Sequence, residues 1–199
     1  MVWIVDAGTG NLRSLANALQ AVGRKPEVRR TPGAPYPRAV VLPGVGAFGH
    51  AVQNLEERGW IGFLRRWAEE GRPLLGICLG MQLLFETSEE SPGARGLGLL
   101  AGQVRRLGEK APRLPHTGWA PLRGAAAGSP EAEVGWAYFV HSYVAEPRDP
   151  SMVAATAEYG EVFPAVVRSG SVTGVQFHPE KSQRGGLRLL GAWSREIGP

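Results

Sequence analysis

The chain has 199 residues, long enough to bury a substantial core, and its 43% hydrophobic and 20% charged residues are typical of a globular protein. The net charge of +4 comes from basic residues scattered in pairs without interleaved aromatics, which argues against a nucleic-acid surface. No apolar run reaches the roughly 18 residues of a membrane helix, and a single cysteine excludes an internal disulfide framework and fits the reducing cytoplasm.

The first half of the chain predicts alternating strands and helices. The opening MVWIVDAG has no basic region and becomes polar at Asp6, so we expect a first strand there and not a signal peptide. Asn11 is a good N-cap for the helix that follows. Strands are expected at 2–5, 26–30, 39–42 and 74–77, and helices at 12–22, from about 48, and at 60–67. Apolar strands separated by helices predict a parallel sheet covered on both faces, with its chemistry at the carboxyl ends of the strands.

The second half predicts mainly strands, joined by short connections rich in Gly and Pro. These runs indicate an antiparallel extension of the sheet, at 103–107, 136–143, 152–157, 165–168 and 172–177. A last helix is expected over 184–193. We find no repeat and no boundary, so residues 1–199 are expected to form a single α/β domain with a mainly parallel central sheet and helices on both faces.

Cys78, the only cysteine, lies between an apolar strand and a helical pattern that starts at Met81. Gly76 and Gly80 stand two residues to either side of it. Gly-x-Cys-x-Gly in this place is the pattern of a nucleophile elbow, where a sharp turn crowds the backbone and a Cβ at either glycine would clash. The start of a helix would also favour a thiolate. The alternative is a buried core cysteine, since this residue type is often buried.

A nucleophilic cysteine needs a base, because a free thiol is mostly protonated at neutral pH. Among the four histidines, His178 ends an apolar strand and is followed by Pro179 and Glu180. Residues two apart in an extended segment face the same side, so the Glu180 carboxylate can orient the His178 ring. Cys78, His178 and Glu180 are therefore the candidate triad. The alternative for His178 is a structural histidine at a strand end, near a solvated glutamate. A metal site is disfavoured, because the single Cys and the four dispersed His residues show no metal-ligand spacing.

The stretch PGVGAFG (43–49) formally matches G-x-G-x-x-G. It lies in the third strand–helix unit, and Leu64 stands where an acidic residue would be expected, so it is a weak dinucleotide signal. We interpret it instead as a glycine turn whose free backbone N–H groups bind an oxyanion. The N–H groups of Val45 and Leu79 are the candidate oxyanion hole.

These motifs resemble those of the class I (triad) glutamine amidotransferases, namely GICLGMQ (76–82), GVQFHPEKS (174–182) and PGVGAF (43–48). Narrower signals are similar to the glutaminase subunits of imidazole glycerol phosphate synthases: DAGTGNLRS (6–14), PHTGW (115–119) and YFVHSY (138–143). The resemblance covers essentially the whole chain and implies a flavodoxin-like architecture.

The resemblance implies that Cys78 attacks the side-chain amide of glutamine, with His178 as the proton carrier and Glu180 orienting it. Glutamate and ammonia are released without a metal or cofactor. By the same resemblance the substrate is held, partly through backbone groups, by Gly44, Gly46, Gln82, His141, Ser142 and Tyr143. Structural roles for Gln82, in the helix, and for His141, through hydrogen bonds, are the alternatives.

The resemblance also implies a partner. Members of this group dock on a (β/α)₈-barrel cyclase as a heterodimer and pass it ammonia, and the cyclase makes imidazole glycerol phosphate and AICAR in histidine biosynthesis. Matching contact positions are Asn11, Ser14, Trp119, Tyr138 and Lys181. For Lys181 a solvated surface lysine is the alternative. Thr9 and Thr117 depart from the expected pattern, which leaves the contacts there open.

Two further hypotheses remain. The chain could serve another synthase, such as anthranilate, aminodeoxychorismate or pyridoxal phosphate synthase, although YFVHSY and DAGTGNLRS disfavour this. It could also be a catalytically silent scaffold, which the intact set of Cys78, His178 and Glu180 disfavours.

Overall fold

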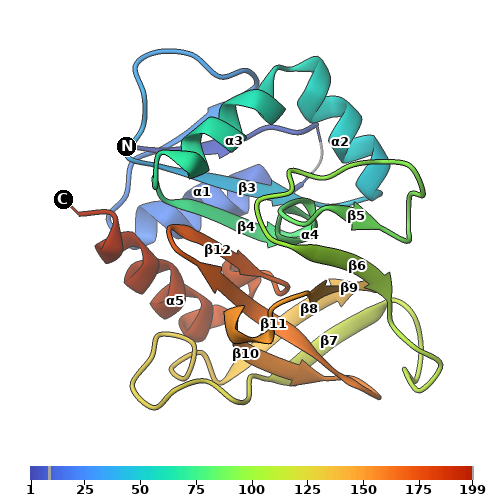
Figure 1. Ribbon diagram of the computed structural model, residues 1–199. Helices are drawn as coiled ribbons and strands as arrows, with labels where there is room; N and C mark the ends of the chain where they lie inside the picture. Colours follow the sequence, from blue (N-terminus) through green and yellow to red (C-terminus); the bar gives the residue numbers. More distant parts are fainter. Residues whose placement is uncertain (9, 199) are drawn as a thin grey trace.

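The computed structural model describes residues 1–8 and 10–198 and centres on a seven-stranded sheet (Figure 1). The strand order is β10-β11-β12-β4-β3-β1-β2. The strands are β1 (Val2–Val5), β2 (Pro26–Arg29), β3 (Ala39–Gly44), β4 (Leu74–Cys78), β10 (Val153–Glu158), β11 (Val162–Ser169) and β12 (Val172–Val175). From β12 to β2 every pairing is parallel, whereas β11 and β10 are added antiparallel. The predicted α/β class with an antiparallel extension is confirmed.

Helices cover both faces of this sheet, with α2 and α3 on one side and α1 and α5 on the other (Figure 1). The helices are α1 (Leu12–Ala21), α2 (Phe48–Glu57), α3 (Trp60–Glu69), α4 (Leu79–Leu83) and α5 (Gln183–Glu196). Alternation along β1 sorts its side chains between the two layers. Val2 and Ile4 pack with α1 and α5, whereas Trp3 and Val5 pack with α2 and α3. Within the described part of the chain, no helix has the length and apolarity needed to cross a bilayer.

The first helix begins where the sequence predicts. The Asn11 side chain accepts a hydrogen bond from the Ser14 backbone N–H at 3.2 Å, which satisfies one of the free donors of the first turn. Thr9, just before it, lies outside the described residues. The helix ends at Ala21, and Gly23 follows with a φ of +80°, a conformation that favours glycine.

The second half differs from prediction in one respect that matters for the site. The single strand expected at 136–143 is two strands, β8 (Trp136–His141) and β9 (Tyr143–Pro147), separated by Ser142. β8 pairs with β7 (His116–Pro121), whereas β9 pairs with β6 (Gly102–Arg106), which also pairs with β5 (Thr87–Ser88). These strands form two small sheets and do not extend the central one. Local sequence could not predict this, because the break reflects a change of pairing partner.

Candidate functional site

The turn after β4 is strained at Cys78, whose backbone has φ +55° and ψ −112°. Residues with a Cβ rarely adopt positive φ, and such strain is often found at active sites. A Cβ on Gly76 would lie 2.7 Å from the Gly80 carbonyl oxygen, within the turn itself. A Cβ on Gly80 would lie 1.7 Å from the Leu42 carbonyl oxygen on the neighbouring strand β3. Both glycines are therefore sterically required, as predicted for an elbow, but Gly80 is required by a strand distant in sequence.

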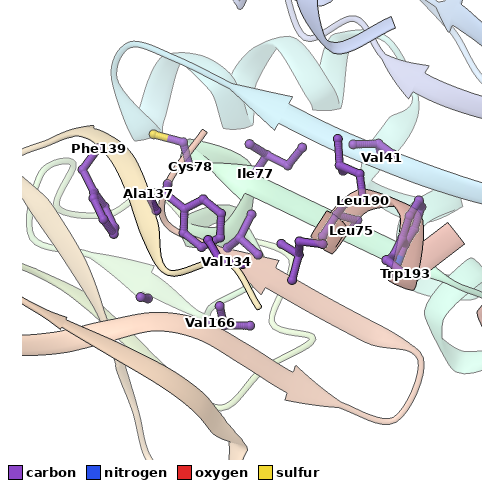
Figure 2. Packing of buried hydrophobic residues seen from close by; sticks show 14 of the residues in the cluster. Val41, Leu75, Ile77, Cys78, Val134, Ala137, Phe139, Val166, Leu190 and Trp193 are labelled. Carbon is purple, nitrogen blue, oxygen red and sulfur yellow. The ribbon is translucent and has the colours of Figure 1, made fainter. Parts of the chain in front are cut away.

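Cys78 lies at the boundary between the core and a pocket. It is only 5% exposed, and Figure 2 shows it beside Ile77 in a row of buried side chains, with its sulfur directed away from Ile77. It also lines a pocket, which a purely structural core cysteine would not need to do. The helix that follows, α4, is only five residues long, so its dipole offers less support to a thiolate than the sequence analysis expected.

Parallel pairing of β12 with β4 brings His178 to Cys78. Val175 lies opposite Ile77, so both strands end at the same edge of the sheet. Nδ1 of His178 is 2.9 Å from Oε1 of Glu180, and both side chains are 6% exposed. Burial lowers the pKa of His178, but hydrogen bonds and charge from Cys78 and Glu180 outweigh this and raise it to about 10. The site therefore favours an imidazolium between the sulfur and the carboxylate.

Glu180→Gln tests this charge pairing. Since folding raises the pKa of His178 above its ordinary value of about 6.5, the pairing adds stability that is complete below about pH 6.5 and is lost as the pH rises through about 10. We expect the free energy of unfolding of the variant to be about 1.5–3 kcal/mol lower than that of the wild type near pH 6.5, and this difference to shrink toward pH 10. Urea unfolding across this pH range measures it, with Glu109→Gln on the surface as the control. A deficit that does not change with pH would contradict the pairing.

Cys78 and His178 open onto a pocket of about 380 Å³. Most of the other residues predicted for the site also line it, namely Val45, Gly46, Leu79, Gln82, His141, Ser142, Tyr143 and Lys181. Gly44 does not line the pocket; it lies opposite Cys78 in the pairing of β3 with β4. Gly46 has a φ of +97°, and Val45 is 41% exposed, so the glycine turn forms part of the pocket rim.

His141 and His116 form a buried pair beside the pocket. Nδ1 of His141 is 3.1 Å from the Tyr143 carbonyl oxygen, and its Nε2 is 3.3 Å from Nδ1 of His116. Because a carbonyl only accepts, His141 carries its proton on Nδ1 and accepts from His116 at Nε2. Burial, together with His116 and His178, lowers the pKa of His141 to about 3 against the Tyr143 hydrogen bond. A neutral His141 therefore holds the backbone of the pocket wall, in line with the structural alternative.

The family model for class-I glutamine amidotransferases matches residues 3–190 of this chain. Subunit HisH of imidazole glycerol phosphate synthase from Symbiobacterium thermophilum is 48% identical, over 98% of this chain and 93% of its own length. The HisH subunit from Aquifex aeolicus is 45% identical, over 97% and 95%. The chain belongs to the HisH group of class-I glutamine amidotransferases.

Solved structures share the fold of this chain. A crystal structure described as a glutamine amidotransferase matches with a TM-score of 0.77 at 25% identity, covering 100% of this chain and 99% of that one. The structure of PurLQS from Thermotoga maritima matches with a TM-score of 0.71 at 18% identity, covering 98% of each chain, and shows the likeness of fold alone.

Two polar side chains of this amidotransferase site were not predicted. Glu90 lines the pocket, and its carboxylate accepts a hydrogen bond from the Phe48 N–H at 2.7 Å, at the start of α2. It lies in a charged loop with no local signal that singles it out. Gln176 is fully buried, and its Nε2 is 3.9 Å from the Cys78 sulfur. A signal for Gln176 did exist: it is a polar residue in an apolar strand, two positions before His178 and so on the same side.

The residues predicted to contact a partner surround the turn that carries Glu180. Trp119 on β7 and Tyr138 on β8 have ring centroids 5.7 Å apart, and the Lys181 ammonium lies 5.9 Å from the centre of the Tyr138 ring. Lys181 lies on the 3₁₀ turn η2 (Pro179–Lys181), which contacts α1, the helix that begins beside Asn11 and carries Ser14. Trp119 is 42% exposed. The structure thus brings these positions to one region, while their role stays a prediction.

Hydrogen bonds connect the backbone of this surface to that of His178, the predicted base. The His178 N–H donates to the Tyr138 carbonyl oxygen at 2.9 Å. The buried Ser182 hydroxyl donates to the His178 carbonyl oxygen at 2.7 Å and accepts from the Tyr138 N–H at 3.0 Å. A displacement of β8 at the surface would therefore reach His178 directly.

Proposed function

We propose that this chain is a glutaminase subunit that hydrolyses the side-chain amide of glutamine to glutamate and ammonia. The observation that carries the proposal is a strained cysteine at a strand end, next to an imidazole paired with a buried carboxylate, on a pocket of about 380 Å³. That volume suits a small amino acid. Membership of the HisH group places the reaction in histidine biosynthesis.

In the proposed mechanism the Cys78 thiol gives its proton to His178, and the sulfur attacks the amide carbon of glutamine. The backbone N–H groups of Val45 and Leu79 receive the developing oxyanion. The C–N bond breaks as His178 passes the proton to the leaving ammonia. A water molecule, deprotonated by His178, then hydrolyses the γ-glutamyl thioester, which releases glutamate and the free cysteine. Glu180 keeps the imidazole in the required tautomer throughout.

The pocket lining supports an amino acid as the substrate. The Glu90 carboxylate supplies a negative charge that suits the α-ammonium group of glutamine. The remaining contacts come from the glycine turn at Gly46, from Gln82 on α4, and from the backbone of Ser142 and Tyr143. The Ser142 backbone is available because β8 ends before it and β9 begins after it.

The second part of the proposal is a cyclase partner. We infer that residues 1–199 act as one cytoplasmic domain that docks on a (β/α)₈ barrel through Asn11, Ser14, Trp119, Tyr138 and Lys181. An exposed aromatic, Trp119, packed against a second ring that has a cation beside it suits a protein interface. The hydrogen bond from His178 to Tyr138, together with the bridge through Ser182, offers a direct route by which docking could change activity.

Glutamine hydrolysis measured under three conditions tests this proposal. We expect slow hydrolysis by the chain alone, and a rise of about tenfold or more when the cyclase subunit and then its nucleotide ligand are added, because typical coupling free energies give changes of this size. Equal rates in all three conditions would contradict coupling to a cyclase. Recovery of a chorismate-using enzyme from a lysate would instead assign the chain to another synthase. Failure of a glutamine-analogue electrophile to label Cys78 in the complex would favour a silent scaffold.

A further inference from the structure

Gln176 lies directly behind the nucleophile. It follows the last residue of β12 and is fully buried, and its backbone N–H donates to the Ala165 carbonyl oxygen at 2.9 Å. Its side-chain Nε2 lies 3.9 Å from the Cys78 sulfur, within reach of a weak hydrogen bond to sulfur. Burial of a primary amide is costly unless its groups find partners, so the orientation of this side chain is chemically determined.

A chain of hydrogen bonds sets which end of the Gln176 amide faces the sulfur. Nε2 of Gln82 donates to the Tyr143 carbonyl oxygen at 2.9 Å, and a carbonyl can only accept. The same Nε2 is 3.1 Å from Oε1 of Gln176, so Gln176 must present its oxygen to Gln82. The NH₂ group of Gln176 is then left to point at Cys78.

The surroundings of the Cys78 sulfur divide into groups that favour the thiol and groups that favour the thiolate. The Val140 carbonyl oxygen, 3.7 Å away, can accept from a thiol but repels a thiolate. Gln176 offers an uncharged donor, and His178 offers a charged one. The other titratable groups around the pocket are His141 on β8, Tyr143 on β9, Glu180 behind His178, and Glu90 and Lys181 in the lining. Apart from His178, Gln176 is the one side chain in the described structure with a hydrogen bond directed at this sulfur.

We propose that Gln176 is a further catalytic residue, whose side-chain N–H donates to the Cys78 sulfur and stabilises its thiolate. The inference rests on the proposed role of Cys78 as the nucleophile. The thiolate appears twice in that reaction, once before attack and once as the leaving group of the thioester. His178 has to release its proton to ammonia between these two events, whereas an amide N–H keeps its proton throughout. In the proposed mechanism His178 is protonated at both of these events, so Gln176 adds to the sulfur an uncharged donor whose proton is never transferred.

Alkylation by iodoacetamide tests the inference without relying on catalysis. Cys78 is the only cysteine, so the alkylation rate reports on this sulfur alone. For Gln176→Met, which keeps the volume but removes the donor, we expect the rate near neutral pH to fall about fivefold, in line with the loss of one ordinary hydrogen bond, since the bond to sulfur is long. The midpoint of the pH profile should move to higher pH, and the rates should converge where the sulfur is fully ionised. Thr173→Val, a buried polar-to-apolar change on the same strand, is the control and should leave the profile in place.

Gln176→Asn is the second variant, to be used if the Gln176→Met protein does not fold. It keeps an amide but is one methylene shorter, so its donor falls short of the sulfur and the profile should shift in the same direction. An unshifted profile in either folded variant overturns the inference. The proposed function fails separately: wild-type complex without glutaminase activity would refute it, whatever the alkylation profile shows.

Discussion

Replacing Cys78 by alanine is expected to abolish synthesis driven by glutamine while leaving synthesis driven by free ammonia intact. The reason is that the two nitrogen sources enter at different sites. Glutamine requires the nucleophile of this chain, and removing a covalent nucleophile costs on the order of 10⁴-fold or more in rate. Free ammonia reaches the cyclase without any step at Cys78. Steady-state product formation by the assembled complex, with glutamine or with an ammonium salt, measures both activities.

Cys78→Gly is the matched variant for this experiment. It also lacks the sulfur, so its glutamine-dependent activity should be equally low. Cys78 has a φ of +55°, so glycine at this position removes backbone strain that alanine keeps. We therefore expect the free energy of unfolding of Cys78→Gly to be about 1 kcal/mol higher than that of Cys78→Ala. Loss of ammonia-dependent synthesis in both variants would show that Cys78 is not the nucleophile of a separate glutaminase site.

Gly80→Ala is expected to have the largest effect on stability. Its Cβ would lie 1.7 Å from the carbonyl oxygen and 2.7 Å from the carbonyl carbon of Leu42. Both atoms belong to the backbone of β3 in the middle of the central sheet, so neither can rotate away. We expect a loss of more than about 4 kcal/mol in unfolding free energy, or failure to accumulate as folded protein. Urea unfolding, or the soluble yield if the loss is complete, measures the effect.

Gly62→Ala is the control, because it makes the same chemical change inside α3. There the nearest atom to the new Cβ is the flexible end of the Arg66 side chain, at 3.5 Å. An alanine in an exposed helix should stabilise the protein by about 0.5–1 kcal/mol. If Gly80→Ala changed the unfolding free energy as little as Gly62→Ala, this would contradict the close approach of α4 to β3.

Much of the site was predictable because its signals are local. Periodicity and turn residues predict β1, α1, β3, α3 and β4 within a few residues of their observed bounds. The glycines around Cys78 predict a sharp turn, and the spacing of His178 and Glu180 predicts their contact, which the structure places at 2.9 Å. Both patterns involve residues at most four apart, so backbone geometry alone determines them.

What the sequence by itself determined is therefore the set of reactive groups: a cysteine on an elbow, a histidine with its carboxylate, and a glycine turn. The tertiary structure decided how they meet. Parallel pairing of β12 with β4 sets His178 beside Cys78, the break at Ser142 opens the pocket wall, and Gln176 is directed at the sulfur. Strand order and pairing partners depend on packing between segments far apart in the chain, which no local periodicity records. Gly80 shows the distinction most clearly, since a residue two positions from the nucleophile is required by the backbone of another strand.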